Sequence, residues 1–223
     1  MSRINYPICA EIIDINTDTP VAGDVFFVDT NVWYWLTYGK ASQGDRPPGI
    51  YQTTDYPNYV SKALTNGAVL YWCGLNLSEI AHLIERTEFE IFRRSNNLGI
   101  RFKPKEYRHN YPTERQNVVS EIEAACIQIK SMAKPLLVEI EEKFPANMLT
   151  KIRTQPMDGY DIIMANAISK MGVINIITDD GDYSCLPGTR VFTANPNVIQ
   201  TAQGLSLVVN RSITTQAVAT SST

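Results

Sequence analysis

Four acidic residues of this chain stand where a protein can use them for chemistry. Asp29 and Asp180 follow short apolar runs closely, and Glu79 and Asp161 lie near the start of expected helices. Carboxylates that gather in one place repel one another unless cations neutralise them. Hard oxygen ligands favour Mg²⁺ or Mn²⁺, and two such ions about 4 Å apart can activate water for phosphodiester hydrolysis. For each acid alone, a helix cap or a turn is the competing interpretation.

Composition narrows the choice of ligands. The chain has only two histidines, His82 and His109, and its four cysteines lie far apart without paired spacing. We therefore expect buried thiols in a reducing cytoplasm, with no zinc site and no disulfide framework. No apolar run approaches the roughly 18 residues of a membrane span, and the N-terminus lacks the apolar core of a secretory signal. The expectation is a cytoplasmic protein that does not enter membranes.

Alternating strands and helices would bring the acids together. Strands are expected at Ile8–Ile15 (an edge strand), Val25–Val28, Ala68–Cys73, Val173–Ile177 and Arg190–Thr193. Helices are expected from about Val32 to Leu36, at Pro57–Leu64, at Leu77–Phe92, from Thr113 to Phe144 with a break near Pro135, and from near Asp161 to Gly172. This order predicts an α/β fold, a three-layer α/β/α sandwich around a parallel sheet. The carboxyl ends of parallel strands share one edge, where such folds bind ligands.

The domain organisation follows from the same pattern. One domain is expected over residues 1–211, with a helical insertion at about 86–148 that needs the α/β core to bury its apolar faces. Residues 38–55 are rich in Gly, Pro and polar groups and are expected to form a long loop. The Ser- and Thr-rich residues 212–223 are expected to be a disordered tail.

Basic residues concentrate within the insertion. Between Arg86 and Arg115 eight Lys or Arg residues face four Glu, a local charge of +4 in a chain of net charge −3. Such a segment could grip phosphates, and a solvated helix face is the equal alternative. The candidates for a nucleic-acid grip are Arg93, Arg94, Arg101, Lys103, Lys105 and Arg108. Tyr38 and Tyr51 are candidates for stacking on a splayed base.

Together these pieces resemble one known family. The matching segments are Val28-Asp-Thr-Asn31, Leu77-Ser-Glu79, Asp161-Ile-Ile-Met-Ala-Asn-Ala167 and Ile177-Thr-Asp-Asp-Gly-Asp-Tyr183. In order and residue type they are similar to the PIN-domain nuclease family, over about residues 24–193. The resemblance implies a PIN-like sandwich and an endoribonuclease that needs Mg²⁺ or Mn²⁺, hydrolyses RNA phosphodiester bonds and leaves 5′-phosphate and 3′-hydroxyl ends.

The resemblance also implies roles for particular residues. By position, the acidic quartet is Asp29, Glu79, Asp161 and Asp180, with Asp182 as a further acid and Asn31 and Thr178 as supporting polar residues. Asp29 and Asp180 would be the principal metal ligands, and Asp179 is the nearer alternative to Asp180. The family includes toxins of toxin–antitoxin pairs, so an antitoxin or regulatory protein and a homodimer are compatible partners. The stretched spacing from Glu79 to Asp161 and the long 38–55 loop depart from many members.

Two other functions compete with the nuclease. A phosphatase with an Asp nucleophile would be expected to carry a second Asp two residues after Asp29, where Asn31 stands, and a primase-like site would want Glu at the first strand end. A PIN-like fold without catalysis could serve as an RNA- or protein-binding scaffold. Metal binding and RNA cleavage distinguish these interpretations.

Overall fold

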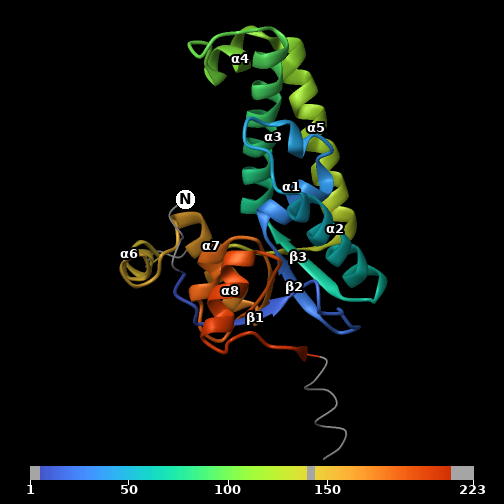
Figure 1. Ribbon diagram of the computed structural model, residues 1–223. Coiled ribbons are helices and arrows are strands. Elements are labelled where there is room, and N and C mark those ends of the chain that lie inside the picture. Colours follow the sequence, from blue (N-terminus) through green and yellow to red (C-terminus); the bar gives the residue numbers. More distant parts are fainter. Residues whose placement is uncertain (1–5, 140–143, 212–223) are drawn as a thin grey trace, which may run out of the picture.

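A six-stranded parallel sheet forms the centre of the protein (Figure 1). The computed structural model describes residues 6–139 and 144–211, so the expected tail at 212–223 lies outside the described residues. Every strand pairing in this part of the chain is parallel, and helices cover both faces of the sheet. The α/β/α sandwich expected from the sequence is confirmed.

The strands follow the order β1-β6-β5-β2-β3-β4 across the sheet. Their bounds are β1 (Glu11–Asp14), β2 (Val25–Val28), β3 (Val69–Cys73), β4 (Lys134–Leu136), β5 (Asn175–Ile177) and β6 (Arg190–Thr193). As expected, the alternating N-terminal strand β1 lies at an edge, where it pairs only with β6 among these strands. The apolar β2 lies inside the sheet between β5 and β3.

Eight α-helices and two short 3₁₀ helices belong to the described residues. They are α1 (Thr30–Thr37), η1 (Ala41–Gln43), α2 (Ile50–Thr65), α3 (Gly74–Ser95), α4 (Pro104–Asn110), α5 (Pro112–Met132), α6 (Phe144–Thr154), α7 (Gly159–Lys170), η2 (Gly181–Cys185) and α8 (Pro196–Gly204). None of the helices in this part of the chain is long and apolar enough to cross a membrane.

Three expectations about the elements were wrong. The second helix begins at Ile50 and not at Pro57, because Gln52 accepts the Gly49 backbone N–H at 2.7 Å and closes the first turn. The long helix ends at Met132, and the segment around Pro135 forms the edge strand β4. Proline disrupts a helix but is tolerated at a sheet edge. No helix was expected between Phe92 and Thr113, but this segment contains the end of α3 and the whole of α4.

Side chains alternate between the two faces of the sheet and fill two cores. Phe26 and Val28 of β2 pack on one face with residues of α1, α2, α3 and α5. Phe27 points to the other face, where α7, α8 and η2 supply the apolar partners. Because both faces are covered, β2 is apolar throughout and not alternating.

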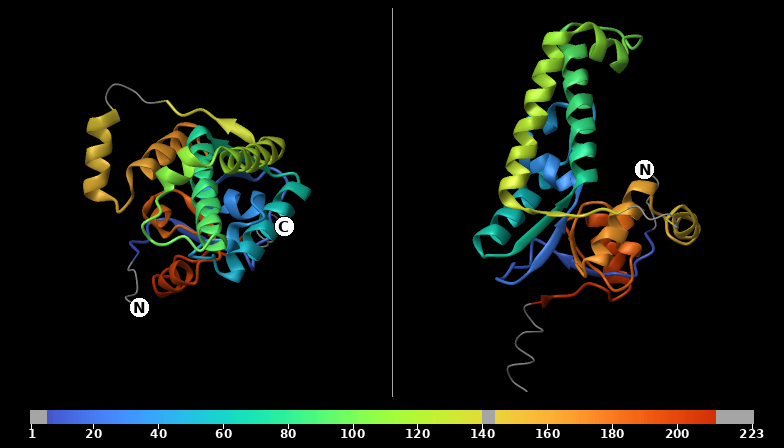
Figure 2. Two further views of the ribbon diagram at one scale, coloured as in Figure 1. Left: turned by 90° about the horizontal axis from the view of Figure 1, so that it is seen from above. Right: turned by 180° about the vertical axis from the view of Figure 1, so that it is seen from behind.

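Helices α3 and α5 form an antiparallel hairpin that extends well beyond the sheet, with α4 at its outer end (Figures 1 and 2). Only the inner part of the hairpin packs on the α/β core, through residues such as Ile84 and Ile129. The outer part has an aromatic cluster of its own: Phe89, Phe92, Phe102, Tyr107, Tyr111, Val118 and Ile122. The expectation that the insertion buries its apolar faces on the core therefore holds only for the inner part.

Candidate metal centre

The candidate site lies where the chain connections of the sheet change direction. Strands β2 and β5 are neighbours, but the chain leaves β2 into α1 on one face and leaves β5 into η2 on the other. Parallel sheets form a crevice at such a switch point, outside the carboxyl ends of the strands. A cavity of about 550 Å³ opens here, and Asp29, Glu79, Asp161 and Asp180 all line it. The fold thus gathers the four acids predicted from the sequence.

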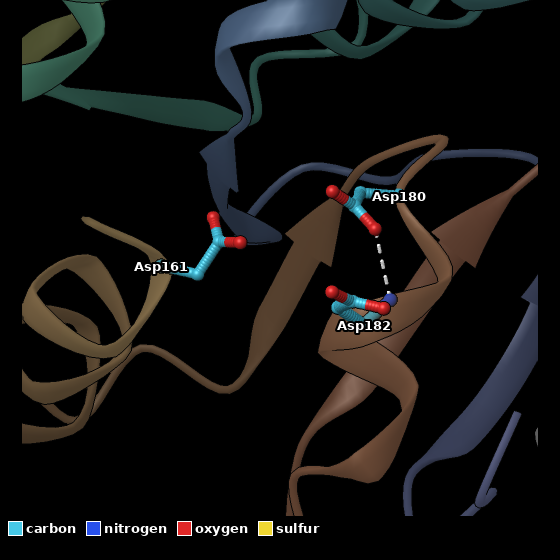
Figure 3. A group of neighbouring side chains, drawn as sticks. All are labelled: Asp161, Asp180 and Asp182. Atoms are coloured by element: carbon cyan, nitrogen blue, oxygen red, sulfur yellow. Dashed lines mark hydrogen bonds between the residues drawn. The ribbon is translucent and has the colours of Figure 1, made fainter. Parts of the chain in front are cut away.

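Three carboxylates form the tightest group (Figure 3). One oxygen from each of Asp161, Asp180 and Asp182 lies within 4.8 Å of the other two. Asp161 projects from the first turn of α7, and Asp180 caps η2 by accepting the Asp182 backbone N–H at 2.9 Å. These spacings suit carboxylate oxygens that surround a single small cation. We call Asp161, Asp180 and Asp182 the acidic triad.

Asp29 borders the triad without joining it. Its side chain is almost completely buried and caps α1, which begins at Thr30 and not near Val32 as expected. One carboxylate oxygen accepts the Thr30 backbone N–H at 2.7 Å, and the other accepts the Thr178 hydroxyl at 2.7 Å. The same Thr178 oxygen accepts the backbone N–H of Asp180 at 2.8 Å. Thr178 therefore ties the end of β2 to the end of β5, as the supporting role predicted for it requires.

Glu79 reaches the cavity from the second turn of α3. The Glu79 carboxylate accepts a short hydrogen bond from the Thr30 hydroxyl. The Thr30 hydroxyl oxygen in turn accepts a hydrogen bond from the side-chain amide of the fully buried Asn76 at 2.9 Å. Asn76 was given no role from the sequence, whereas Thr30 belongs to the segment Val28-Asp-Thr-Asn31 that carries the resemblance. The Asn31 side chain, predicted to support the site, lines the cavity but makes no hydrogen bond among the described residues. His82 also lines the cavity.

Two further residues of the site, Asp158 and Tyr183, were not predicted from the sequence. Asp158 caps α7 through one oxygen, which accepts the N–H groups of Tyr160 and Asp161, and it lines the cavity. Tyr183 is fully buried beside the acids; its hydroxyl faces the Asp161 carboxylate but makes no hydrogen bond of good geometry among the described residues. A signal for Asp158 was present, because Asp is a preferred N-cap residue.

Burial, reinforced by neighbouring carboxylates, raises the pKa values of the acidic triad, Asp29 and Glu79. Burial is the main cause for Asp29, whose pKa rises to about 7 although the Thr178 hydrogen bond opposes the change. The pKa of Asp161 rises to about 8, through burial and then the charges of Asp29 and Asp180. The pKa of Asp182 rises to about 6, and burial also raises the pKa values of Asp180 and Glu79.

The negative charge of the ionised carboxylates in the site is not offset by any Lys or Arg of the described residues. Among residues 6–139 and 144–211, no Lys or Arg forms an ion pair with the triad, Asp29 or Glu79, and none lines the cavity. Buried charges in proteins are normally paired or bind metals. The site holds an uncompensated cluster of oxygen ligands, which fits a hard divalent cation.

The two neighbouring aspartates after β5 have separate environments. Asp180 joins the triad, whereas Asp179 points toward α2. The Asp179 carboxylate accepts hydrogen bonds from Gln52 at 2.5 Å and from Tyr56 at 2.8 Å. The choice of Asp180 over Asp179 as the acid that lies in the cluster agrees with the structure.

The basic residues proposed to grip nucleic acid lie far from the cavity. About 24 Å of α3 separates Glu79 from the helix end at Ser95, given a rise of about 1.5 Å per residue. Arg93 and Arg94 pair with Asp45, and Arg108 pairs with Glu85 at 2.5 Å. The remaining three, which follow the end of α3, are exposed and form no ion pair among the described residues: Arg101, Lys103 and Lys105.

Comparison with protein-family models, with curated proteins and with solved structures found no match to this chain. The fold and the site by themselves define the class of protein: an α/β/α sandwich with a carboxylate cluster at the switch point of its sheet.

Proposed function

We propose that this protein is a PIN-like endoribonuclease that depends on Mg²⁺ or Mn²⁺ and hydrolyses RNA phosphodiester bonds. The observation that carries the proposal is the acidic triad, whose three carboxylates converge within 4.8 Å without a Lys or Arg of the described residues to balance them. Its place at the switch point and the motif resemblance support the same activity. When bound, divalent ions at such a site activate water and stabilise the leaving oxygen.

Each residue of the site has a task in this proposal. Asp161, Asp180 and Asp182 hold the cation, and Asp29 adds a fourth carboxyl group beside them. Thr178 positions Asp29 through one hydrogen bond and Asp180 through another. The principal ligands in this proposal are the acidic triad, in place of the pair Asp29 and Asp180 that the sequence predicts.

Glu79 and Asp158 also line the cavity and suit a second cation or a bound water. The Thr30 hydroxyl fixes one oxygen of Glu79, and capping of α7 occupies one oxygen of Asp158. Each side chain retains one oxygen without a hydrogen-bond partner among the described residues. The Tyr183 hydroxyl, which faces the acids from the buried side, can donate to a carboxylate oxygen or a water held there.

The test is cleavage of a mixed pool of single-stranded RNA with Mg²⁺, with Mn²⁺ and with EDTA. Asp180→Asn removes a triad charge, and Asp179→Asn is its matched control, because Asp179 lies outside the triad. We expect metal-dependent cleavage that Asp180→Asn abolishes and that Asp179→Asn retains. Products should carry 5′-phosphate ends.

Isothermal calorimetry with Mn²⁺ separates metal binding from catalysis. We expect binding to the intact chain and to Asp179→Asn, and much weaker binding to Asp180→Asn. No cleavage of any RNA together with no Mn²⁺ binding would refute the proposal and favour a scaffold.

A further inference from the structure

A second cavity of about 310 Å³ adjoins the metal centre. The two cavities share Asn31 and Leu83 in their linings, so they lie side by side. Helix α1, the segment 41–52 and the middle of α3 supply its walls. We call this cavity the loop pocket. The residues that line it include Trp35, Arg46, Arg86, Thr87 and Glu90. A volume near 300 Å³ suits a small ligand.

The loop pocket offers cations and an aromatic face where the metal centre offers carboxylates. Arg46 is exposed and makes no hydrogen bond or ion pair among the described residues. Arg86 donates its Nε–H to Glu90 at 3.0 Å, which fixes the guanidinium and leaves its terminal nitrogens for a ligand. Trp35 is partly exposed, and its indole lies against the buried Tyr56 with ring centroids 5.5 Å apart.

The segment that carries Arg46 is anchored to the hairpin. The buried Glu90 carboxylate accepts the Asp45 backbone N–H at 2.7 Å, and the Asp45 side chain pairs with Arg93 and Arg94. A Cβ atom at Gly44 would lie 3.0 Å from a Glu90 oxygen, so glycine allows this close approach. Two prolines after Arg46 stiffen the segment further. Arg46 is thus presented by a fixed loop that holds it at the pocket.

Tyr38, one of the two tyrosines proposed for base stacking, is unsuited to it. Tyr38 is buried and donates to Glu88 at 2.7 Å, and the Tyr51 hydroxyl faces Asp179. Trp35 instead lines the cavity next to the metal centre and keeps part of its surface exposed. Stacking on an aromatic face accepts any base, because every base has a π-face.

We propose that the loop pocket binds the nucleotide next to the scissile phosphate, with its base on Trp35 and its further phosphate on Arg46 and Arg86. This inference rests on the proposed function, because it takes single-stranded RNA as the substrate. The metal centre is lined by carboxylates, whereas the loop pocket presents two guanidinium groups. An RNA strand fits this contrast if its reacting phosphate contacts metal ions held by the carboxylates and its next phosphate contacts Arg46 and Arg86. Asn31, at the shared wall, faces both.

The test measures binding of a fluorescein-labelled RNA of about ten nucleotides by anisotropy in EDTA, so that cleavage plays no part. For Arg46→Ala we expect about tenfold weaker binding and a salt slope, log K against log salt, smaller by about 0.7. The matched control is Arg153→Ala, an exposed arginine on α6 that lines neither cavity, which should change neither quantity.

The stacking contact has its own pair of variants. Trp35→Leu should weaken binding by about tenfold or more, since stacking contributes about 1–3 kcal/mol per base, and it should leave the salt slope unchanged. Trp35→Phe keeps an aromatic face and should retain most of the affinity. Thermal unfolding of both variants shows whether the contact with Tyr56 survives.

The outcomes separate the two proposals. Wild-type RNA binding that Arg46→Ala and Trp35→Leu do not alter would overturn the loop pocket, and metal-dependent cleavage would still stand. Weakened binding of these variants in a chain that cleaves no RNA would support the pocket and refute the nuclease. Failure of the wild-type chain to bind RNA in EDTA would overturn the pocket, and cleavage would then be judged on its own assay.

Discussion

Replacing Asp29 by asparagine should stabilise the metal-free protein at pH 8.5 and leave it nearly unchanged at pH 5. Asp29 is 3% exposed, and burial raises its pKa from 3.8 to about 7. The unfolded chain loses this proton near pH 3.8, whereas the folded chain keeps it to about pH 7. Unfolding therefore releases a proton between these values, so stability falls as the pH rises through that window. Asparagine removes the group that titrates.

The expected gain follows from the same pKa values. A pKa that moves from 3.8 to about 7 corresponds to about 4 kcal/mol above pH 7. An amide cannot accept hydrogen bonds at both ends, so the contact with either Thr30 or Thr178 is weakened at a cost of about 1–2 kcal/mol. A net gain of about 2 kcal/mol remains at pH 8.5, which raises Tm by roughly 4–8 °C for a chain of this size.

The assay is thermal unfolding in EDTA at both pH values, with Glu123→Gln as control because Glu123 is exposed on α5. Added Mn²⁺ should raise the Tm of the unsubstituted chain at pH 8.5. At a free Mn²⁺ concentration of one hundred times Kd, binding adds about 2.7 kcal/mol to the free energy of unfolding. Asp29→Asn should gain less. If Asp29→Asn were equally destabilised at pH 5 and pH 8.5, the reasoning from a buried, repelled carboxylate would be wrong.

Three further substitutions probe the contacts around the site. Thr178→Val should cost about 1–3 kcal/mol in denaturant unfolding and raise the pKa of Asp29 further, because a buried acceptor loses its donor, whereas Thr178→Ser should match the unsubstituted chain. Tyr183→Phe removes a hydroxyl that makes no hydrogen bond of good geometry among the described residues, so the free energy of unfolding of the metal-free protein should change by less than about 1 kcal/mol. Its Mn²⁺ affinity should fall. A loss of more than about 2 kcal/mol in the free energy of unfolding would show that the hydroxyl is hydrogen-bonded, for example to Asp161. Gly181→Ala would place a Cβ inside contact distance of the Tyr6 ring and should cost about 1–3 kcal/mol, a penalty that Tyr6→Ala relieves in a double-mutant cycle.

Local patterns predicted the centre of the fold because its strands are buried on both faces. The apolar run of β2 and the acid after it could be recognised directly, and so could the alternating edge strand β1. Strand β4 could not, since it has three residues, includes Pro135 and exists only through pairing with β3. Its hydrogen bonds are made across the sheet, and no local propensity encodes them.

The site shows the same limit at the scale of one residue. The first helix begins two residues earlier than expected, so Thr30, and not Asn31, bonds Glu79. Each residue turns a helix by about 100°, so an error of this size changes which side chain faces the site. The loop pocket is harder still, because segments 41–52 and 83–90 meet only in three dimensions.

The position of β1 has a consequence for synthesis of the chain. Glu11 pairs with Arg190, which lies 179 residues further along. At about 5–20 residues per second, the ribosome needs roughly 10–40 s to deliver that partner. Throughout this interval β1 lacks its partner strand, and unpaired strand edges invite aggregation. The growing chain therefore offers chaperones their most persistent target at its first strand, long after the β2–β3 unit can form.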